Sequence, residues 1–230
     1  MRAWLWVAWM VAAAGAEDRI LDQARRARDA QDRAALEKSA ARAAAAADRQ
    51  PQDPRRQYEA AVIHSYLAEI ASETGDRSGA ARAVRAGIPA AERAVALDPN
   101  SAEYHRLLGA LCGQAVPADL SLALRYGGRA RDELDRAIRL APADSDAYLS
   151  RGVGKLYLPK PLGGGPEAAL EDLRKAVELN PRSDQAHLWL GVALRRANRP
   201  AEARAALLQA VKLNPNRVWA KQQLDKTPAQ

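Results

Sequence analysis

One short pattern occurs four times in this chain of 230 residues, and it constrains the fold more than any other feature. The pattern is Ala-(Val/Ile)-x-Leu-x-Pro, beginning at Ala94, Ala137, Ala176 and Ala210. A segment that recurs every few tens of residues is typical of stacked repeats, in which each unit buries its apolar face on its neighbours. Each copy ends an apolar helical segment with a proline that cannot continue it. The chain is therefore expected to be all-α, a right-handed solenoid of about four helical hairpins.

The spacing of the repeats and the residues inside them resemble a known family. The four prolines, at positions 99, 142, 181 and 215, lie 43, 39 and 34 residues apart. The last unit reads His187-x2-Leu190-Gly191-x2-Leu194, then Ala203-x3-Leu207 and Pro215. This resembles the tetratricopeptide repeat (TPR), W-x2-L-G-x2-Y…A-x3-F…P in 34 residues, with the aromatic positions replaced. The two preceding units match more loosely. The resemblance implies a protein-interaction module without catalytic activity.

Three of the units place a glycine in the middle of a helix, where glycine costs about 1 kcal/mol relative to alanine. Such a position predicts a close approach of the two helices of one hairpin. Small and branched residues at the facing positions of the second helix would complete the contact. The glycines are Gly109, Gly152 and Gly191, and their expected partners are Ala130, Ala169, Ala203, Leu134, Leu173 and Leu207.

The repeat boundaries divide the chain into successive units. We expect a signal peptide (1–16), an N-terminal hairpin or half-repeat (17–50), a divergent repeat (55–99), two repeats with insertions (102–142 and 145–181), a regular repeat (184–215) and a capping helix (216–230). The nine extra residues of the first insertion fall around Gly113 to Gly128, and the five of the second around Leu158 to Gly165. Both insertions are expected between the two helices of a hairpin.

The first residues are typical of a secretory signal. Arg2 precedes an apolar run from Ala3 to Ala13, and Ala14-Gly15-Ala16 is a small-residue cleavage pattern. The run is shorter than the ~20 residues that span a bilayer, so a retained anchor is the alternative. We expect a periplasmic or secreted bacterial protein that is not embedded in the membrane after cleavage.

Composition argues against several function classes. The 35 basic residues are interleaved with 28 acidic ones, which is typical of solvated helix faces and predicts no nucleic-acid binding despite a net charge of +7. Cys112 is the sole cysteine and is expected to be a buried apolar residue. His64, His105 and His187 have no ligand or catalytic partner at a recognisable spacing. We therefore expect no catalytic residues, no metal and no cofactor.

The first helix of each hairpin predicts a binding stripe on the concave face, because residues at i, i+3, i+7 and i+10 share one side of a helix. In TPR proteins this stripe commonly holds a peptide; here its middle is apolar and its ends are charged. The alternative is that Leu149, Val153 and Leu188 only contact neighbouring helices. The predicted groove residues are Glu103, Arg106, Asp146, Leu149, Val153, Leu156, Gln185, Leu188, Val192 and Arg195.

A second candidate surface lies where one hairpin departs from the repeat pattern. Arg151 replaces the expected leucine, and Lys155 replaces the expected aromatic residue. With Tyr157 and Lys160 of the adjacent insertion, these residues could form a specialised surface. The alternative is that both long side chains extend past the enlarged loop to solvent.

Taken together, these features predict a non-enzymatic scaffold that binds a protein or peptide segment in its concave groove. The alternative function is a small-molecule-binding envelope protein associated with transport. The sequence leaves the partner unnamed.

Overall fold

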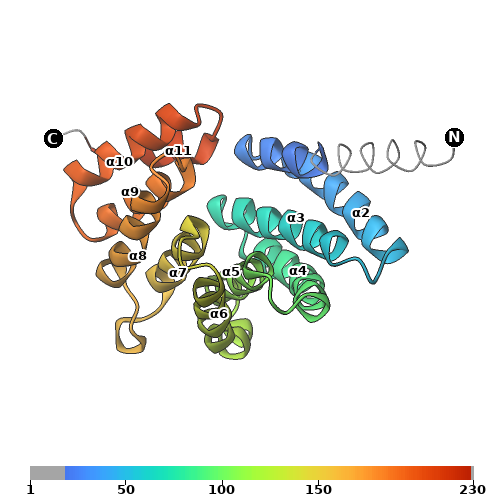
Figure 1. The fold of residues 1–230 in the computed structure, drawn as a ribbon. Helices are drawn as coiled ribbons and strands as arrows, with labels where there is room; N and C mark the ends of the chain where they lie inside the picture. The colour runs from blue at the N-terminus through green and yellow to red at the C-terminus, as the bar shows by residue number, and fades with distance from the viewer. Residues whose placement is uncertain (1–18, 229–230) are drawn as a thin grey trace, which may run out of the picture.

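In a computed structural model, the chain folds as a curved stack of helical hairpins (Figure 1), and the structure describes residues 19–228. Every regular element in this range is helical. Residues 19–29 form the first described helix. The others are α2 (Arg33–Arg49), α3 (Pro54–Glu73), α4 (Arg77–Leu97), α5 (Ala102–Ala118), α6 (Leu120–Leu140), α7 (Ser145–Tyr157), η1 (Lys160–Leu162), α8 (Pro166–Leu179), α9 (Asp184–Arg196), α10 (Pro200–Leu213) and α11 (Val218–Asp225).

The helices pack as a solenoid. Four hairpins pair α3 with α4, α5 with α6, α7 with α8, and α9 with α10. The first helices of successive hairpins also pack on one another, from α3 through α5 and α7 to α9, and line the inside of the curve (Figure 1). This architecture confirms the predicted all-α solenoid. The expected signal segment, residues 1–16, lies outside the described residues, and no helix within the described part is long and apolar enough to cross a membrane.

The helix starts follow from local sequence. Ser101, Asp144 and Ser183 are the N-caps of α5, α7 and α9, and each side chain accepts a hydrogen bond from a backbone N–H of the first turn. Each of these caps lies two residues after one of the repeat prolines. The proline ends one hairpin and the cap begins the next, so the repeat pattern is also a pattern of helix boundaries.

The mid-helix glycines mark the closest helix contacts, as predicted. A Cβ atom on Gly109, Gly152 or Gly191 would lie 2.6, 2.8 or 2.5 Å from the Cγ atom of the leucine on the facing helix. Real Cβ atoms do not approach other atoms so closely, so alanine would force the hairpin apart. The facing residues are Leu134, Leu173 and Leu207, as expected from the sequence.

The two insertions have different structures. The first, around Gly113 to Gly128, lies at the boundary of α5 and α6 and does not form a long loop. Its residues instead lengthen both helices, so that α5 and α6 have 17 and 21 residues where α9 and α10 have 13 and 14. Helix propagation adds a backbone hydrogen bond with each added residue, which explains this outcome in a segment rich in alanine and leucine. The second insertion does form a loop, around η1, with Gly163 in the left-handed region at φ 81°.

The buried side chains form two hydrophobic cores. One extends from Ala24 to Ala130 and the other from Leu156 to Ala220. Polar contacts also join the first described helix to the segment before α11, although these lie more than 180 residues apart in sequence. The curve of the solenoid therefore brings its two ends together.

Candidate functional site

The predicted inner stripe is accessible over α5 and α7. Glu103 is exposed and accepts a hydrogen bond from the Tyr58 hydroxyl on α3, at 2.5 Å. The Arg106 guanidinium is only partly exposed and lies 4.0 Å from the Asp144 carboxylate. These polar groups connect successive hairpins along the inside of the curve.

The apolar part of the stripe on α7 is half-buried. Leu149 and Val153 pack against the second core but keep part of their surface exposed, and Asp146, one turn earlier, is exposed. A carboxylate next to two partly exposed apolar side chains is the combination that the sequence predicted for a groove holding a segment with hydrophobic anchors.

The remaining apolar members of the stripe are core residues, which corrects this part of the prediction. Leu156, Leu188 and Val192 are 5, 0 and 3% exposed. The neighbouring helices cover them, as the alternative interpretation held for Leu188. In this conformation their side chains cannot contact a partner.

Other parts of the protein also cover the polar end of the stripe on α9. The Arg195 guanidinium donates to the backbone carbonyl of Gln223, at 3.4 Å, and to the side-chain amide oxygen of the same residue. With its amide oxygen turned toward the two guanidinium groups, the orientation that satisfies both, the Gln185 side chain accepts from Arg217 Nε at 3.3 Å and from Arg28 at 3.2 Å. The inner face is therefore accessible over α5 and α7 and covered over α9.

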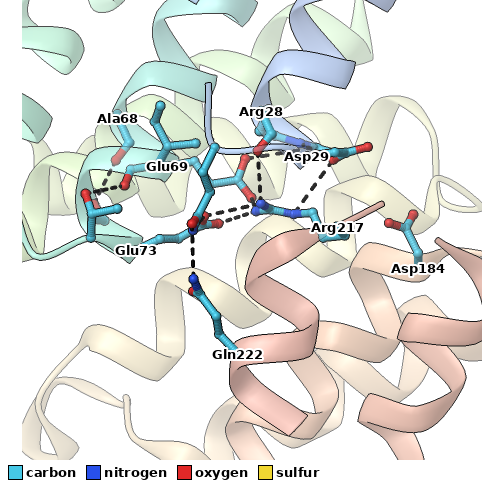
Figure 2. Close-up of polar contacts among 12 residues, drawn as sticks. Arg28, Asp29, Ala68, Glu69, Glu73, Asp184, Arg217 and Gln222 are labelled. Carbon is cyan, nitrogen blue, oxygen red and sulfur yellow. Dashed lines mark hydrogen bonds and ion pairs between the residues drawn. The ribbon is translucent and has the colours of Figure 1, made fainter. Parts of the chain in front are cut away.

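The contact that covers this end centres on Arg217, which the sequence analysis did not single out. Arg217 is the residue before α11 and is 0% exposed. Its guanidinium donates to the carboxylates of Glu69 (2.9 Å) and Glu73 on α3, and to the backbone carbonyl of Arg28 (3.2 Å). Figure 2 shows these carboxylates from α3 and the first described helix converging on it, with Asp29 at 3.8 Å.

Further polar contacts surround this ion pair. The Asn214 amide donates to Asp29 at 3.0 Å and to Asp184 at 2.9 Å, so it connects the first described helix to α9. Gln222 of α11 donates to the Gln31 side chain at 3.2 Å. We call the cluster of Arg28, Asp29, Glu69, Glu73, Asn214 and Arg217 the end clasp.

The charges of the end clasp are unequal. Its three carboxylates face two guanidinium groups, and all five side chains are largely buried. Burial and the neighbouring Glu69 raise the pKa of Glu73 to about 7, although Arg217 acts in the opposite direction.

The four residues of the second predicted surface, Arg151, Lys155, Tyr157 and Lys160, do not form one continuous surface. Arg151 Nε and Nη2 donate to the two oxygens of Asp172, at 2.9 and 2.7 Å, and Lys155 Nζ lies 2.9 Å from the same carboxylate. Asp172 is only 2% exposed. Burial raises its pKa, but the hydrogen bonds from Arg151 and Lys155 lower the pKa more, and the net pKa is below the ordinary value. These two basic residues therefore neutralise a buried carboxylate, which neither sequence interpretation anticipated.

The other two members of that surface lie elsewhere. Tyr157 packs edge-on against Trp189, with ring centroids 6.3 Å apart, and Arg196 lies over its ring at 4.8 Å. Lys160 is exposed in η1. Trp189 also contacts Trp219 at 4.9 Å, and Trp219 is a core residue of α11.

Two of the residues that could carry chemistry, His105 and Cys112, are buried. His105 bonds to the Glu133 carboxylate (2.6 Å) and to the Pro99 carbonyl (2.9 Å), and it holds a repeat proline to the next hairpin. Burial raises the pKa of the Cys112 thiol to about 12, as expected for an apolar core residue. Among residues 19–228, no group of three potential ligands could hold a metal ion.

Residues 163–218, which include α8, α9 and α10, match the family model of the tetratricopeptide repeat. This segment has the sequence of tetratricopeptide repeats. A search of curated protein sequences finds no significant match.

Two solved structures superpose on most of the chain. The chain superposes on TTC0263, a thermophilic TPR protein of Thermus thermophilus, with a TM-score of 0.63 and 18% identity, over 92% of this chain and 98% of the other. Human IFIT1, solved as a dimer with m7Gppp-AAAA, gives 0.64 and 15% identity, over 84% of this chain and 41% of IFIT1. At these identities the similarity shows the fold alone.

Proposed function

We propose that this TPR protein is a non-enzymatic scaffold that binds a protein or peptide segment against the inner face of α5 and α7. Stacked helical repeats present extended surfaces, and TPR folds commonly serve as protein-interaction scaffolds. The single observation that carries the proposal is the accessible stretch of inner face, where Leu149 and Val153 stay partly exposed on α7. Two exposed carboxylates, Asp146 on α7 and Glu103 at the equivalent position of α5, lie near the starts of these helices.

The chemistry of this stretch defines the partner. Its two apolar side chains are suited to hydrophobic anchors, and the two exposed carboxylates near the starts of α5 and α7 suit basic residues on one side of those anchors. The partner is therefore an extended or helical segment with one or two apolar side chains next to lysine or arginine. We further propose that the signal-like leader directs the protein to the periplasm or the exterior of a bacterium, where no nucleic acid competes for the surface.

The small-molecule alternative requires an enclosed apolar pocket. A hollow of about 570 Å³ over α7 and α8 is open, and charged side chains such as Arg174, Lys175 and Glu178 line it. No observation on the described residues favours a transported ligand over a protein segment.

The test is an affinity capture from bacterial envelope extract with the full chain as bait. Two variants weaken the proposed face in different ways: Leu149→Glu with Val153→Glu removes the anchors, and Asp146→Lys reverses an exposed charge without touching the core. Leu208→Glu is the matched control, because Leu208 is 49% exposed on α10, away from this face. Circular dichroism verifies that each variant keeps its helix content.

We expect the wild type and Leu208→Glu to retain the same protein and both inner-face variants to lose it. Equal retention by all four baits would place the partner elsewhere on the solenoid. A wild-type bait that retains no protein from the extract would count against the scaffold function itself.

A further inference from the structure

The two insertions of the repeat carry the most exposed large apolar side chains among the described residues. Leu120 and Leu124, at the start of α6, are 78 and 82% exposed, and Leu162 in η1 is 69% exposed. The next, Leu208 on α10, is 49% exposed. Exposed leucines scattered singly are ordinary, but three that gather in the insertions of two successive hairpins indicate a surface with a function.

Helix lengths explain why the two leucines of α6 are uncovered. α5 and α6 have 17 and 21 residues, whereas α7 and α8 of the next hairpin have 13 and 14, so the first hairpin extends past the second. Leu124 lies about three helical turns before Asp135, which contacts Arg151 of α7, so it is on the side of the shorter hairpin. Leu120 shares that face, while Leu122 between them is buried in the first core.

Both insertions lie at the same edge of the solenoid. Each falls between the two helices of its hairpin. Because α5 and α7 pack side by side in successive hairpins, the turns that follow them project in the same direction. Figure 1 shows the end of the α5–α6 hairpin and the η1 loop at the lower edge of the molecule.

Basic side chains accompany the leucines. Arg125 and Lys160 are exposed, each within two residues of one of the leucines, and neither pairs with a carboxylate within residues 19–228. The nearby Asp119 is the N-cap of α6 and accepts hydrogen bonds from its first turn, and the Arg85 guanidinium of α4 lies 3.9 Å from it. The edge therefore combines apolar groups with unpaired positive charge. We call Leu120, Leu124, Leu162, Arg125 and Lys160 the tip patch.

This chemistry favours a lipid surface over a protein. A stable protein interface takes about 20–30 residues on each side and close shape complementarity, whereas the tip patch offers three leucines on two projections. In a symmetric contact between two copies, Arg125 and Lys160 would face like charges. A bilayer accepts projecting leucines without a matching shape, and anionic headgroups attract unpaired cations.

We propose that the tip patch docks the protein on an anionic lipid surface. The three leucines insert at the boundary between headgroups and acyl chains, and Arg125 and Lys160 contact the headgroup phosphates. The contact is peripheral, and the solenoid stays outside the bilayer. The inner face of α5 and α7 takes no part in it, so docking goes beyond the proposed scaffold function and leaves that face free for a partner.

A local probe on the full chain tests this proposal, because the apolar residues 3–13 can bind vesicles by themselves. An environment-sensitive fluorophore is attached either to Ser121→Cys in the tip or, as a reference, to Asn100→Cys in the turn between α4 and α5 at the opposite edge. Both positions are exposed, and Cys112 is buried and stays unlabelled. The vesicles contain phosphatidylglycerol and phosphatidylcholine in equal amounts, or phosphatidylcholine alone.

We expect the emission of the tip label to shift to shorter wavelength on the anionic vesicles, because the label enters an apolar environment. The emission of the reference label should not change. On phosphatidylcholine alone, the lipid concentration at the midpoint of the shift should be about 30-fold higher, because each of two cations near an anionic surface contributes roughly fivefold.

Variants separate the two contributions of the tip patch. Arg125→Gln with Lys160→Gln should raise the midpoint on anionic vesicles by the same factor of about 30. Leu120→Ser with Leu124→Ser should raise the midpoint about 10- to 100-fold, because two apolar side chains no longer leave water. Leu208→Ser is the matched control and should keep the wild-type midpoint. Circular dichroism verifies the helix content of each variant.

Two results would overturn lipid docking: a tip label whose emission does not change on anionic vesicles, or a double leucine variant with the wild-type midpoint. A tip label that shifts only when lipid-free envelope proteins are added would also overturn it and would assign the tip patch to a protein. The vesicle experiments contain no protein partner, so their outcome is independent of the capture experiment on the inner face.

Discussion

Replacing Arg151 and Lys155 together, by Leu and Tyr, tests the role of the buried Asp172. The two new residues restore the repeat pattern, and from sequence alone they should raise stability. In the structure, however, they remove the three contacts of 2.7 to 2.9 Å that neutralise a carboxylate that is 2% exposed. The double variant should therefore be less stable than the wild type.

The expected change in the free energy of unfolding of the double variant is the difference between two opposing contributions. Breaking a buried ion pair by removing one partner costs about 3–5 kcal/mol. Burying leucine and the tyrosine ring in place of the basic side chains raises the free energy of unfolding by about 1–2 kcal/mol. The net loss is about 1–4 kcal/mol, which for a chain of this length lowers the Tm by roughly 2–16 °C.

Urea and thermal unfolding, followed by circular dichroism, measure this loss. Adding Asp172→Leu to the double variant should recover most of the stability, because no buried charge then remains. Arg174→Leu is the control: Arg174 lies 4.0 Å from Glu202 on the surface, and its loss should have almost no effect. A double variant as stable as the wild type would refute the reasoning.

The pH dependence gives an independent check of the same interaction. The pKa of Asp172 is lowered in the folded protein, so its contribution is complete above the ordinary value of 3.8 and is lost as the pH falls below it. In the double variant the same carboxyl has no cationic partner, and protonation relieves the penalty. The stability difference between wild type and double variant should therefore shrink below pH 4.

Two further predictions concern the packing. Gly191→Ala places a Cβ atom 2.5 Å from Leu207 Cγ and should lower the free energy of unfolding by about 1–2 kcal/mol. Gly154→Ala meets no atom within 4 Å and should raise the free energy of unfolding by about 1 kcal/mol. The urea midpoints of the two variants should therefore move in opposite directions, and a shift in the same direction would contradict the close-approach argument. Cys112, whose thiol pKa is raised to about 12 by burial, should not react with a thiol reagent at pH 8 until the protein is unfolded, and rapid labelling of the folded protein would show that the α5 interface opens.

Much of the fold could be predicted because the repeat is local. The spacing of glycine, alanine and leucine within one unit defines a hairpin, and the proline with the cap two residues later defines where the next begins. Leu134, Leu173 and Leu207 accordingly pack where the pattern places them. The first insertion was harder to interpret, because a segment rich in alanine and leucine can lengthen two helices as readily as it can form a loop.

The candidate site was only partly predictable. Helical periodicity places Leu149 and Leu188 at equivalent positions of successive repeats, yet one is half-buried and the other is 0% exposed. The difference arises because the C-terminal end of the solenoid is covered and the middle is open. Periodicity within one helix carries no information about which repeat is covered.

The sequence by itself determined the unit: its helices, its caps and the contacts between neighbouring hairpins, all of which involve residues close together in the chain. Only the tertiary structure decided how the units curve and therefore that Arg217 meets Glu69, Glu73 and Asp29. The physical reason is that the small rotation added by each hairpin, together with the helices lengthened by an insertion, accumulates over the stack. The relative position of the two ends depends on the rotation accumulated over all the hairpins, and the sequence of a single repeat does not determine it.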